Sequence, residues 1–420
     1  MQVLPYDGLN ILQFGKVCFN RISNKRCLPG IQVKNCRIYS PIEKIVNFQT
    51  DNIGFSKVRS LSAIMKNRKA KVELTLYFFT IYSYNRDVSI RKNGGTIMSV
   101  KRIGVLTSGG DAPGMNPCVR AVVRTALYHG LECYGIRRGW NGLISGDIVR
   151  LDEKSVSHTI NKGGTILYTA RSKEFMTEEG QRKAVSTCKF LGLDSIIAIG
   201  GDGTFRGARA LSKYGINVIG IPGTIDNDIS CTNYCIGFDT AANTAIECID
   251  KLRDTMQSHE RCSVVEVMGR NAGYLAMYVG LAVGATAVLV PEEKIDFERD
   301  VVEKIRKARF NGFTHYMIVV AEGAGSASDI AAKIKEATDL DPRVTVLGHI
   351  QRGGTPTGRD RVNATKMGYL AVELLLQGKT NRIVCTHDGG FTDVDIDEGL
   401  AMQKSIQQME VDVLAAMTGI

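Results

Sequence analysis

A hydrophobic run long enough to cross a bilayer is absent from this sequence of 420 residues. The longest apolar stretch near its beginning, residues 72–84, is interrupted by Glu73 and by three hydroxyl side chains, whereas a membrane helix needs about 20 consecutive apolar residues. We therefore expect a soluble protein with no membrane partner. Disorder, collagen and coiled coil are also excluded, because 44% of the residues are hydrophobic and only 23% are charged.

Paired cysteines are missing as well. The eleven cysteines are odd in number, and they show neither CxxC spacing nor paired histidines. The sequence thus signals neither a zinc site nor a disulfide framework. Cys188 and Cys248 stand in apolar or helical surroundings, where a buried free thiol is the ordinary state. Free thiols fit a reducing compartment, and we expect a cytoplasmic protein.

Acidic residues are scarce in the first 97 positions, where 5 Asp and Glu accompany 16 Lys and Arg. This segment carries a charge of +11, while the whole chain carries +10, so residues 98–420 are close to neutral. They contain no basic stripe interleaved with aromatic side chains. The distribution therefore argues against a nucleic-acid partner.

Residues 1–97 form an atypical basic extension without sustained apolar periodicity, and we expect it to lack a stable core. A transit peptide would be richer in serine, and a secretory signal would need an apolar stretch behind a basic start. Met98 follows Gly94-Gly95, whose codons can form a bacterial ribosome-binding sequence at the spacing that initiation requires. Our hypothesis is that residues 1–97 are upstream sequence read as protein, with a genuine accessory extension as the alternative. An intact mass that includes Met1, measured on the native protein, would contradict it.

From Met98 onward, short β-rich runs that end in glycine or polar loops alternate with helical stretches such as Val119–Tyr128. This alternation predicts βαβ units and mainly parallel sheets, and 323 residues favour two α/β domains over one. Polar residues cluster after the strands, where open α/β sheets bind ligands. The predicted strands are Arg102–Leu106, Ser195–Ile199, Asn217–Ile221, Ser263–Val267, Tyr316–Ala321 and Val344–Leu347.

Two glycine-rich loops follow predicted strands. Gly109-Gly110-Asp111 could cradle a phosphate at a helix N-terminus, or could be only a tight turn, and it lacks the GxGxxG pattern of dinucleotide folds. In residues 200–204, Gly-Gly-Asp-Gly-Thr, bare backbone lets a triphosphate approach, and Asp202 is placed to hold Mg²⁺. The alternative for Asp202 is a helix N-cap.

The segment Pro222–Asp228 is the best candidate for chemistry. Asp226 and Asp228 project differently from one loop, so one carboxylate can accept a hydroxyl proton while the other orients a metal or a neighbouring group. A solvated acidic turn is the alternative. Guanidinium groups near strand-end loops suit a phosphorylated substrate, because they bind phosphate bidentately. These arginines are Arg171, Arg261, Arg270, Arg343 and Arg352, and His349 lies beside them in sequence.

These motifs together closely resemble the bacterial ATP-dependent 6-phosphofructokinases. The resemblance covers residues 98–420, and the motifs occur in the family's order. The segments that carry it are residues 107–116, 200–204, 222–228, 268–270 and 348–354.

The resemblance implies transfer of the γ-phosphoryl group of Mg²⁺-bound ATP to fructose 6-phosphate, which gives fructose 1,6-bisphosphate, the committed step of glycolysis. Asp226 would be the general base and Asp202 the magnesium ligand, while Arg171 would stabilise the transferring group. Thr224 and Asp228 complete the implied catalytic set. The implied nucleotide site comprises Gly110, Trp140, Arg171, Ser172, Gly201, Asp202, Gly203 and Thr204. The implied sugar-phosphate site comprises Thr224, Asp226, Asp228, Arg261, Met268, Gly269, Arg270, Glu322, Arg343, His349 and Arg352.

The resemblance also implies two Rossmann-like three-layer α/β domains, the larger interrupted by the smaller. Residues 98–236 and 350–400 would form the larger, ATP-binding domain; residues 237–349 and 401–420 would bind the sugar phosphate. The implied assembly is a homotetramer whose active sites are shared, with Arg261 and Arg343 coming from a neighbouring subunit.

Two glycines indicate the phosphoryl donor. Pyrophosphate-dependent relatives carry Asp at the position resembling Gly203 and Lys at the position resembling Gly223, so the glycines here favour ATP. An added carboxylate at 203 would crowd and repel the α-phosphate. Trp140 stands where the family has Tyr and could stack on adenine; Ser172 and Met176 also depart from the family.

An allosteric site is expected to be weak. Arg120, Arg124 and Arg253 match family positions that bind the phosphates of ADP or phosphoenolpyruvate. Three family cations are lost and one anion is gained among the other positions, which should weaken anion binding. The departures are Glu153 for Arg, His158 for Asp, Thr286 for Glu, and Asn311 and Phe313 for Lys.

Other functions remain as alternatives. A nicotinamide-dinucleotide or lipid kinase can share the Gly-Gly-Asp-Gly-Thr loop, but it lacks the Asp226–Asp228 loop in this setting and the 349–354 segment. A regulatory paralogue that binds sugar phosphate without turnover would need a lost base or metal ligand, and Asp226, Asp202 and Arg171 are intact. A binding protein built on the basic residues 1–97 is the third alternative.

Overall fold

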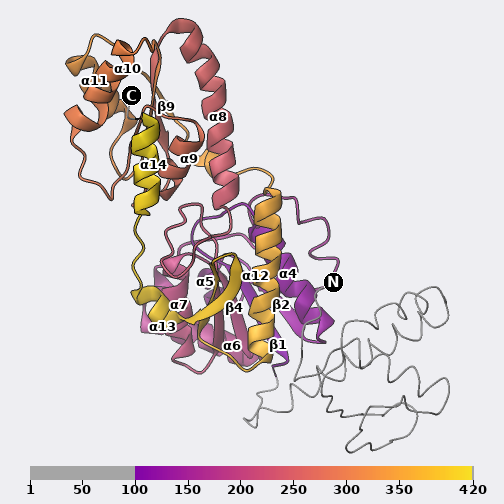
Figure 1. Ribbon diagram of the computed structural model, residues 1–420. Coiled ribbons are helices and arrows are strands. Elements are labelled where there is room, and N and C mark those ends of the chain that lie inside the picture. Colours follow the sequence, from indigo (N-terminus) through magenta and orange to yellow (C-terminus); the bar gives the residue numbers. More distant parts are fainter. Residues whose placement is uncertain (1–99, 419–420) are drawn as a thin grey trace, which may run out of the picture. The chain divides into compact units, whose positions relative to one another are not determined.

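The computed structural model describes residues 100–418. The hypotheses on residues 1–97 lie outside the described residues. Within the described part, two β-sheets with flanking helices form the framework (Figure 1).

The larger sheet has seven strands in the order β11-β10-β5-β4-β1-β2-β3. The central pairs β10–β5, β5–β4, β4–β1 and β1–β2 are parallel, whereas β10–β11 and β2–β3 are antiparallel. Central strands such as β4 are buried along their whole length, which explains their continuous apolar sequence. The strands are β1 (Arg102–Thr107), β2 (Glu132–Ile136), β3 (Ile148–Leu151), β4 (Ser195–Gly200), β5 (Asn217–Pro222), β10 (Arg382–His387) and β11 (Gly390–Asp395).

The smaller sheet has four parallel strands in the order β7-β8-β6-β9. Strand β8 is buried throughout, while β9 is an edge strand with three of its four residues exposed. The strands are β6 (Cys262–Val267), β7 (Ala287–Leu289), β8 (Tyr316–Ala321) and β9 (Arg343–Val346).

The helices cover these sheets and connect them. Helix α12 lies along α4 (Figure 1), and Gly368 permits the close approach, because a Cβ there would lie 2.8 Å from both Cys118 O and Ala121 Cβ. The helices are α4 (Met115–Tyr128), α5 (Trp140–Ser145), α6 (Glu178–Leu191), α7 (Asp202–Ser212), α8 (Phe238–His259), α9 (Tyr274–Ala282), α10 (Glu303–Phe310), α11 (Ala327–Ala337), α12 (Gly358–Leu376), α13 (Ile396–Ala401) and α14 (Gln408–Thr418). Shorter helical turns span Glu174–Met176, Glu298–Val302 and Gly348–Arg352.

The predicted α/β class with mainly parallel sheets is confirmed. All six predicted strands occur with ends within one residue of the prediction, but the helix expected at Val119 begins at Met115. Five strands were missed, namely β2, β3, β7, β10 and β11. The larger sheet draws its strands from residues 98–236 and 350–400, and the smaller sheet from 237–349; the domain boundaries themselves stay a prediction.

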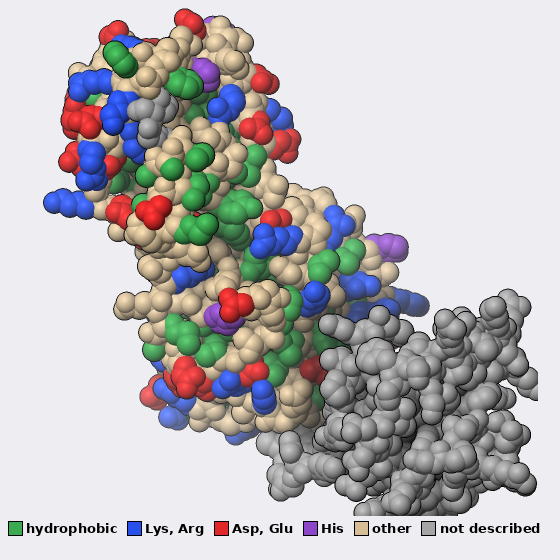
Figure 2. Space-filling model, viewed as in Figure 1, with side chains coloured by type: hydrophobic (Ala, Val, Ile, Leu, Met, Phe, Trp, Pro, Cys, Tyr) green, Lys and Arg blue, Asp and Glu red, His purple; other side chains and the backbone are tan. Residues whose placement is uncertain are grey.

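Charged side chains of both signs are mixed on the surface of the described part. On the face drawn in Figure 2, Lys and Arg side chains alternate with Asp and Glu.

The eight cysteines of the described residues are all free thiols, and seven are buried. None of the helices within residues 100–418 is long and apolar enough to span a membrane.

Candidate active site

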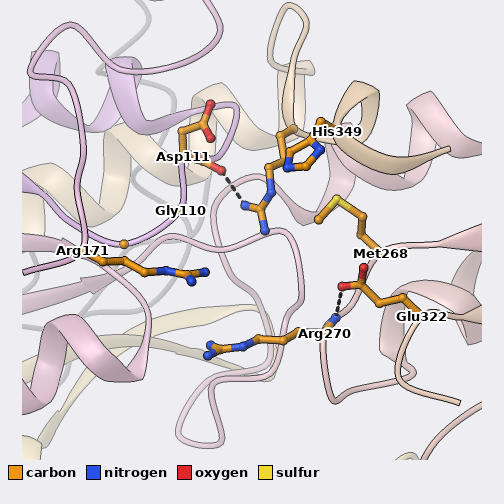
Figure 3. Close-up of a pocket in the computed structure, with 9 residues that line it drawn as sticks. Gly110, Asp111, Arg171, Met268, Arg270, Glu322 and His349 are labelled. Carbon is orange, nitrogen blue, oxygen red and sulfur yellow. Dashed lines mark hydrogen bonds between the residues drawn. The ribbon is translucent and has the colours of Figure 1, made fainter. Parts of the chain in front are cut away.

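A pocket of about 360 Å³ opens at the carboxyl ends of strands from both sheets. Strand β1 leads into the glycine loop with Asp111, the segment after β3 supplies Arg171, and the segments that follow β6, β8 and β9 supply the other charged side chains. This is the edge at which parallel sheets bind ligands. The lining residues are Gly109, Gly110, Asp111, Arg171, Met268, Arg270, Glu322, His349 and Arg352 (Figure 3). Seven of the nine belong to the predicted site.

The two glycine loops are tied to each other. The Thr204 hydroxyl donates a hydrogen bond of 3.0 Å to the carbonyl of Ser108, which precedes the first loop. Gly109 adopts φ +93°, a conformation that side chains disfavour. Helix α7 begins at Asp202 with Gly201 as its N-cap, so the alternative of Asp202 as the N-cap is wrong. The free N–H groups at this helix start suit a phosphate.

The Asp202 carboxylate remains accessible at the start of α7. Its side chain is 46% exposed, and the nearest cation is Arg206, 3.8 Å away in the next turn. The adjacent Gly203 has open space where a Cβ would stand. The helix start thus combines an accessible carboxylate with room for a ligand.

The acidic loop after β5 is held in a defined turn. The Thr224 hydroxyl accepts a hydrogen bond of 3.2 Å from the Asp226 amide. Asn227 adopts φ +52°, and its side-chain oxygen accepts a bond of 2.9 Å from the Cys235 amide. Asp226 is only 6% exposed, and its Oδ1 has no hydrogen-bond partner among the described residues. A buried acceptor without a partner is costly in a structural role and typical of a functional one.

Burial raises the pKa of all three carboxyls in this region above their usual range. For Asp226, Arg352 opposes the effect and Glu322 adds to it. For Asp228, burial and then the charges of Asp226 and Asp202 raise the pKa to about 6. Repulsion by the neighbouring carboxylates therefore adds to the effect of burial at Asp228.

Arginine side chains in the pocket face the acidic loop. Arg352 donates a hydrogen bond of 3.1 Å to the Asp111 carbonyl, and it occupies the space that a Cβ at Gly110 would need, with Nη1 only 2.6 Å away. The Arg270 amide donates to Glu322 Oε1 at 2.7 Å. Figure 3 shows Arg171 and Arg270 directed toward the same space from opposite sides. The pocket thus has positive charge facing the acidic loop.

Arg270 is held in an unusual backbone conformation, which fixes where its side chain begins. It adopts φ +59° directly after Gly269 at φ +146°. Gly269 is required there, because a Cβ would collide with the carbonyl of Ala272. The predicted substrate residue Gly269 therefore shapes the turn that presents Arg270.

Arg261 and Arg343 lie at the opposite end of the smaller sheet. Arg261 precedes β6 and Arg343 begins β9, whereas the pocket residues follow the carboxyl ends of these strands. A strand of six residues spans about 20 Å, so neither guanidinium reaches the pocket of its own chain. Both lie near Asp341, whose pKa they help to lower, and Arg343 is 3.4 Å from it.

Trp140 lies in the core, beside the predicted nucleotide site. It is 4% exposed, and its ring stacks on Phe175 with centroids 4.6 Å apart and planes 11° apart. The Ser172 hydroxyl accepts a bond from the Phe175 amide at 3.1 Å. Stacking of adenine on Trp140 would require Phe175 to move away, and it stays a prediction.

The predicted effector arginines lie on two helices. Arg120 and Arg124 are one turn apart on α4, and Arg253 on α8 donates to the Val283 carbonyl. Among the departures, Thr286 exchanges hydrogen bonds with the Met317 backbone. Glu153, His158, Asn311 and Phe313 are exposed.

Three contributors were missed by sequence reasoning. Gly109 and Asp111 line the pocket although only Gly110 of that motif was selected. Lys404 donates a hydrogen bond of 2.7 Å to the Asn227 carbonyl in the acidic loop. The first two stand in a recognisable motif, whereas no pattern in the sequence connects Lys404 with position 227.

Comparison with known proteins identifies close relatives. The profile of the Phosphofructokinase family matches residues 102–375. An ATP-dependent 6-phosphofructokinase of Clostridium botulinum is 51% identical over 319 residues, which are 76% of this chain and 100% of the relative. An ATP-dependent 6-phosphofructokinase 1 of Clostridium perfringens is 53% identical over 309 residues, or 74% of this chain and 97% of the relative.

Solved structures agree with this assignment. Phosphofructokinase from Saccharomyces cerevisiae superposes with a TM-score of 0.68 at 32% identity over 76% of this chain, which spans only 48% of the yeast chain. A pyrophosphate-dependent phosphofructokinase from Marinobacter aquaeolei shares the fold, with a TM-score of 0.67 at 21% identity over 76% of this chain and 92% of that chain. The chain belongs to the phosphofructokinase family.

Proposed function

We propose that this chain transfers the γ-phosphoryl group of ATP to the 1-hydroxyl of fructose 6-phosphate, which yields fructose 1,6-bisphosphate in glycolysis. The activity accords with the named relatives at 51% and 53% identity. The observation that carries the proposal is the Asp226 carboxylate, buried at the acidic loop with a free Oδ1 beside a pocket lined with arginines.

Asp226 is proposed as the general base. A hydroxyl hydrogen-bonded to Oδ1 would lose its proton to this carboxylate as the oxygen attacks phosphorus. Burial raises the pKa of Asp226, which makes it a stronger base, while the positive charge of Arg352 favours the ionised form that can accept a proton. Asp228 and Thr224 flank the base and shape the loop.

The arginines are proposed to bind and stabilise phosphate charge. Arg171 faces the pocket together with Arg270, so the two guanidinium groups can neutralise the transferring group and the sugar phosphate. Glu322 fixes the Arg270 backbone and presents an acceptor to sugar hydroxyls. Met268, Gly269, His349 and Arg352 complete the proposed sugar-phosphate site.

Magnesium fits the residues on the nucleotide side. Mg²⁺ usually takes one or two carboxylates together with phosphate oxygens and waters, and the accessible Asp202 carboxylate offers such a ligand. Groups of three or more metal-binding side chains do not occur within residues 100–418, which agrees with a metal held mainly by substrate. When bound, the ion would neutralise charge on the phosphates of ATP.

ATP is the proposed donor because of the space at α7. At Gly201 and Gly203 the backbone is open enough for phosphates to approach, and Gly110 and Thr204 complete the two loops. Nothing lies within 4 Å of a Cβ placed at Gly203, so an α-phosphate can be accommodated there.

A homotetramer with shared sites is proposed from the position of two arginines. Arg261 and Arg343 stand at the end of the smaller sheet that faces away from the pocket of their own chain. They can bind sugar phosphate only across a contact with another copy, and the exposed edge strand β9 is available for that contact.

A cytoplasmic location is proposed on the state of the thiols. All eight cysteines of the described residues are free, although Cys231 and Cys385 stand with sulfurs 3.6 Å apart. Such thiols persist in reducing compartments.

The test uses the full chain with fructose 6-phosphate and magnesium, and it offers ATP and pyrophosphate in parallel. Asp226→Asn keeps the shape of the base but removes its basicity, and Asp250→Asn, on an exposed face of α8, is the matched control. We expect ATP-dependent formation of fructose 1,6-bisphosphate that falls by about 10³-fold or more in Asp226→Asn, a loss that includes the base itself and the charge it carries.

Each outcome is informative. Turnover with pyrophosphate alone would contradict the argument from Gly203. Retention of activity in Asp226→Asn would contradict the role of the base, and absence of turnover with either donor would contradict the proposed reaction.

A further inference from the structure

Lys404 lies in the non-helical segment between α13 and α14, far in sequence from the acidic loop. Its ammonium group donates hydrogen bonds to two loop carbonyls, that of Asn227 at 2.7 Å and that of Thr232 at 3.3 Å. It also stands 4.6 Å from the ring centroid of Tyr274, within cation–π distance. One cation thus contacts the acidic loop at two points and the start of α9.

Asn227 is the residue between the two carboxylates Asp226 and Asp228. Its φ of +52° lies in the left-handed region, which asparagine adopts more readily than other residues with a Cβ. Its side chain accepts from the Cys235 amide and donates weakly, at 3.4 Å, to the Asn233 carbonyl. The peptide carbonyl that leads to Asp228 is fixed by Lys404.

The surroundings of Lys404 are largely apolar and acidic. Burial lowers the pKa of its ammonium group, while the charges of Asp228 and Glu410 and the thiols Cys235 and Cys231 favour the protonated form. Partial burial of a lysine costs free energy when no carboxylate is in hydrogen-bond contact with it. Its two carbonyl acceptors and the tyrosine ring supply the compensation.

The contact also joins the two sheets. Asn227 and Thr232 belong to the loop after β5 of the larger sheet, whereas Tyr274 begins α9 beside the smaller sheet. Lys404 therefore ties the loop with the proposed base to the element that follows the Met268–Arg270 turn.

We propose that Lys404 is a positioning residue for phosphoryl transfer: it fixes the Asn227–Asp228 peptide, and thereby the Asp226 and Asp228 carboxylates, relative to the sugar-phosphate side of the pocket. This inference rests on the proposed function. Lys404 does not line the pocket, so its removal should impair the transition state more than the binding of substrates.

The experiment compares Lys404→Met with Lys304→Met in the full chain. Lys304 is a matched control, because it too is half-buried with a pKa lowered by burial, but it lies on α10 rather than in the segment that bonds to the acidic loop. We expect kcat of Lys404→Met to fall about 10- to 100-fold, as displacement of a catalytic group by about 1 Å does. KM for ATP and for fructose 6-phosphate should stay within about threefold.

Arginine should rescue the reaction. Lys404→Arg keeps a cation with several donors over the Tyr274 ring, and its kcat should stay within about fivefold of the parent chain. Tyr274→Phe keeps the ring and should be nearly silent, whereas Tyr274→Leu should lower kcat in the same direction as Lys404→Met. Circular dichroism and thermal unfolding establish that each variant is folded.

Some results would overturn the proposal. These are a kcat of Lys404→Met within twofold of Lys304→Met, a loss confined to KM, or a folded Lys404→Arg as impaired as Lys404→Met. If Lys404→Met does not fold, Lys404→Gln replaces it under the same criteria. Turnover by the parent chain and by Lys304→Met tests the proposed reaction separately, because absence of turnover in both would contradict the function rather than the role of Lys404.

Discussion

The two sheets contribute different groups to and around one pocket. The larger sheet is followed by the glycine loops and by the carboxylates Asp202, Asp226 and Asp228 beside the pocket, whereas the smaller sheet is followed by Arg270 and Glu322 in the pocket lining. Burial is the main cause of the raised pKa values of these three carboxyls, the other two carboxylates add to it only for Asp228, and the arginines oppose the shifts only in part. This difference accords with the proposal that the larger-sheet side takes the metal-bound nucleotide and the proton, while the smaller sheet binds the sugar phosphate.

The largest effect is expected from a test of the proposed sharing of the site between copies of the chain. Arg343→Ala should lose about 100-fold or more in kcat/KM for fructose 6-phosphate, since a bidentate phosphate contact disappears. Asp226→Asn should be inactive for the separate reason given above. Unfolded together and reassembled, the two inactive chains should regain activity, because some sites combine the intact Asp226 of one chain with the intact Arg343 of the other.

The controls are the two variants reassembled separately, which should stay inactive. If the mixture stays as inactive as its parents while the parent chain recovers from the same treatment, Arg343 does not act across a subunit contact.

The next test adds a charge at position 203, and it concerns only the side of the pocket proposed to bind the nucleotide. Gly203→Asp places a carboxylate in open space at the start of α7, so the fold should tolerate it. We expect KM for ATP to rise by about 10-fold or more, because two negative groups would meet there. KM for fructose 6-phosphate should change little.

Gly203→Asn separates charge from size in this test. It adds nearly the same volume without the negative charge, so it should raise KM for ATP much less than Gly203→Asp. Equal effects of the two variants would mean that space, rather than charge, decides nucleotide binding.

The α/β class and the principal strands could be read from the sequence, because buried parallel strands are continuous apolar runs that end in glycine or acid, and the family could be read from the resemblance of the motifs that follow them. β8 was found at its full length as Tyr316–Ala321. Strands such as β2 and β11 escaped because two of the five residues of β2 are only partly buried, and none of the six residues of β11 is buried. The motif residues of the pocket were found for the same reason as the strands, since the motifs directly follow them.

What could not be read was contact between distant segments. Nothing local to Trp140 shows that Phe175 covers its ring, and nothing near Lys404 indicates the Asn227 carbonyl. The placement of Arg261 and Arg343 away from the pocket depends on strand direction, which only the assembled sheet reveals. Such relations arise from tertiary packing, and a single sequence does not encode them as a pattern.

A smaller effect, on the free energy of unfolding, is expected from a substitution of Asp228 in the acidic loop. Burial raises the pKa of Asp228 to about 6 from 3.8, so the ionised carboxylate disfavours the folded state above pH 6. Asp228→Asn should therefore stabilise the fold by about 1–3 kcal/mol at pH 8, since one pKa unit corresponds to about 1.4 kcal/mol.

The gain should shrink as the pH falls from 6 toward 3.8, because the parent carboxyl then takes up its proton in the folded state. Denaturant unfolding at pH 8 and pH 5, with Asp250→Asn as the exposed control, measures it. A stabilisation that is equal at the two pH values would not come from this carboxylate's charge.

The smallest effect is expected at the predicted effector positions, where some of the family's basic side chains are replaced. Arg120, Arg124 and Arg253 retain positive charge, but Asn311 and Phe313 replace cations, and Glu153 adds a negative charge. ADP or phosphoenolpyruvate should therefore shift the half-saturating concentration of fructose 6-phosphate by less than about twofold, because few charge-assisted bonds to phosphate remain. Restoring lysine at 311 and 313 together should enlarge the response, since both positions are exposed and accept a charge without repacking. A strong sigmoidal response of the unaltered chain, reversed by ADP, would show instead that the three arginines suffice.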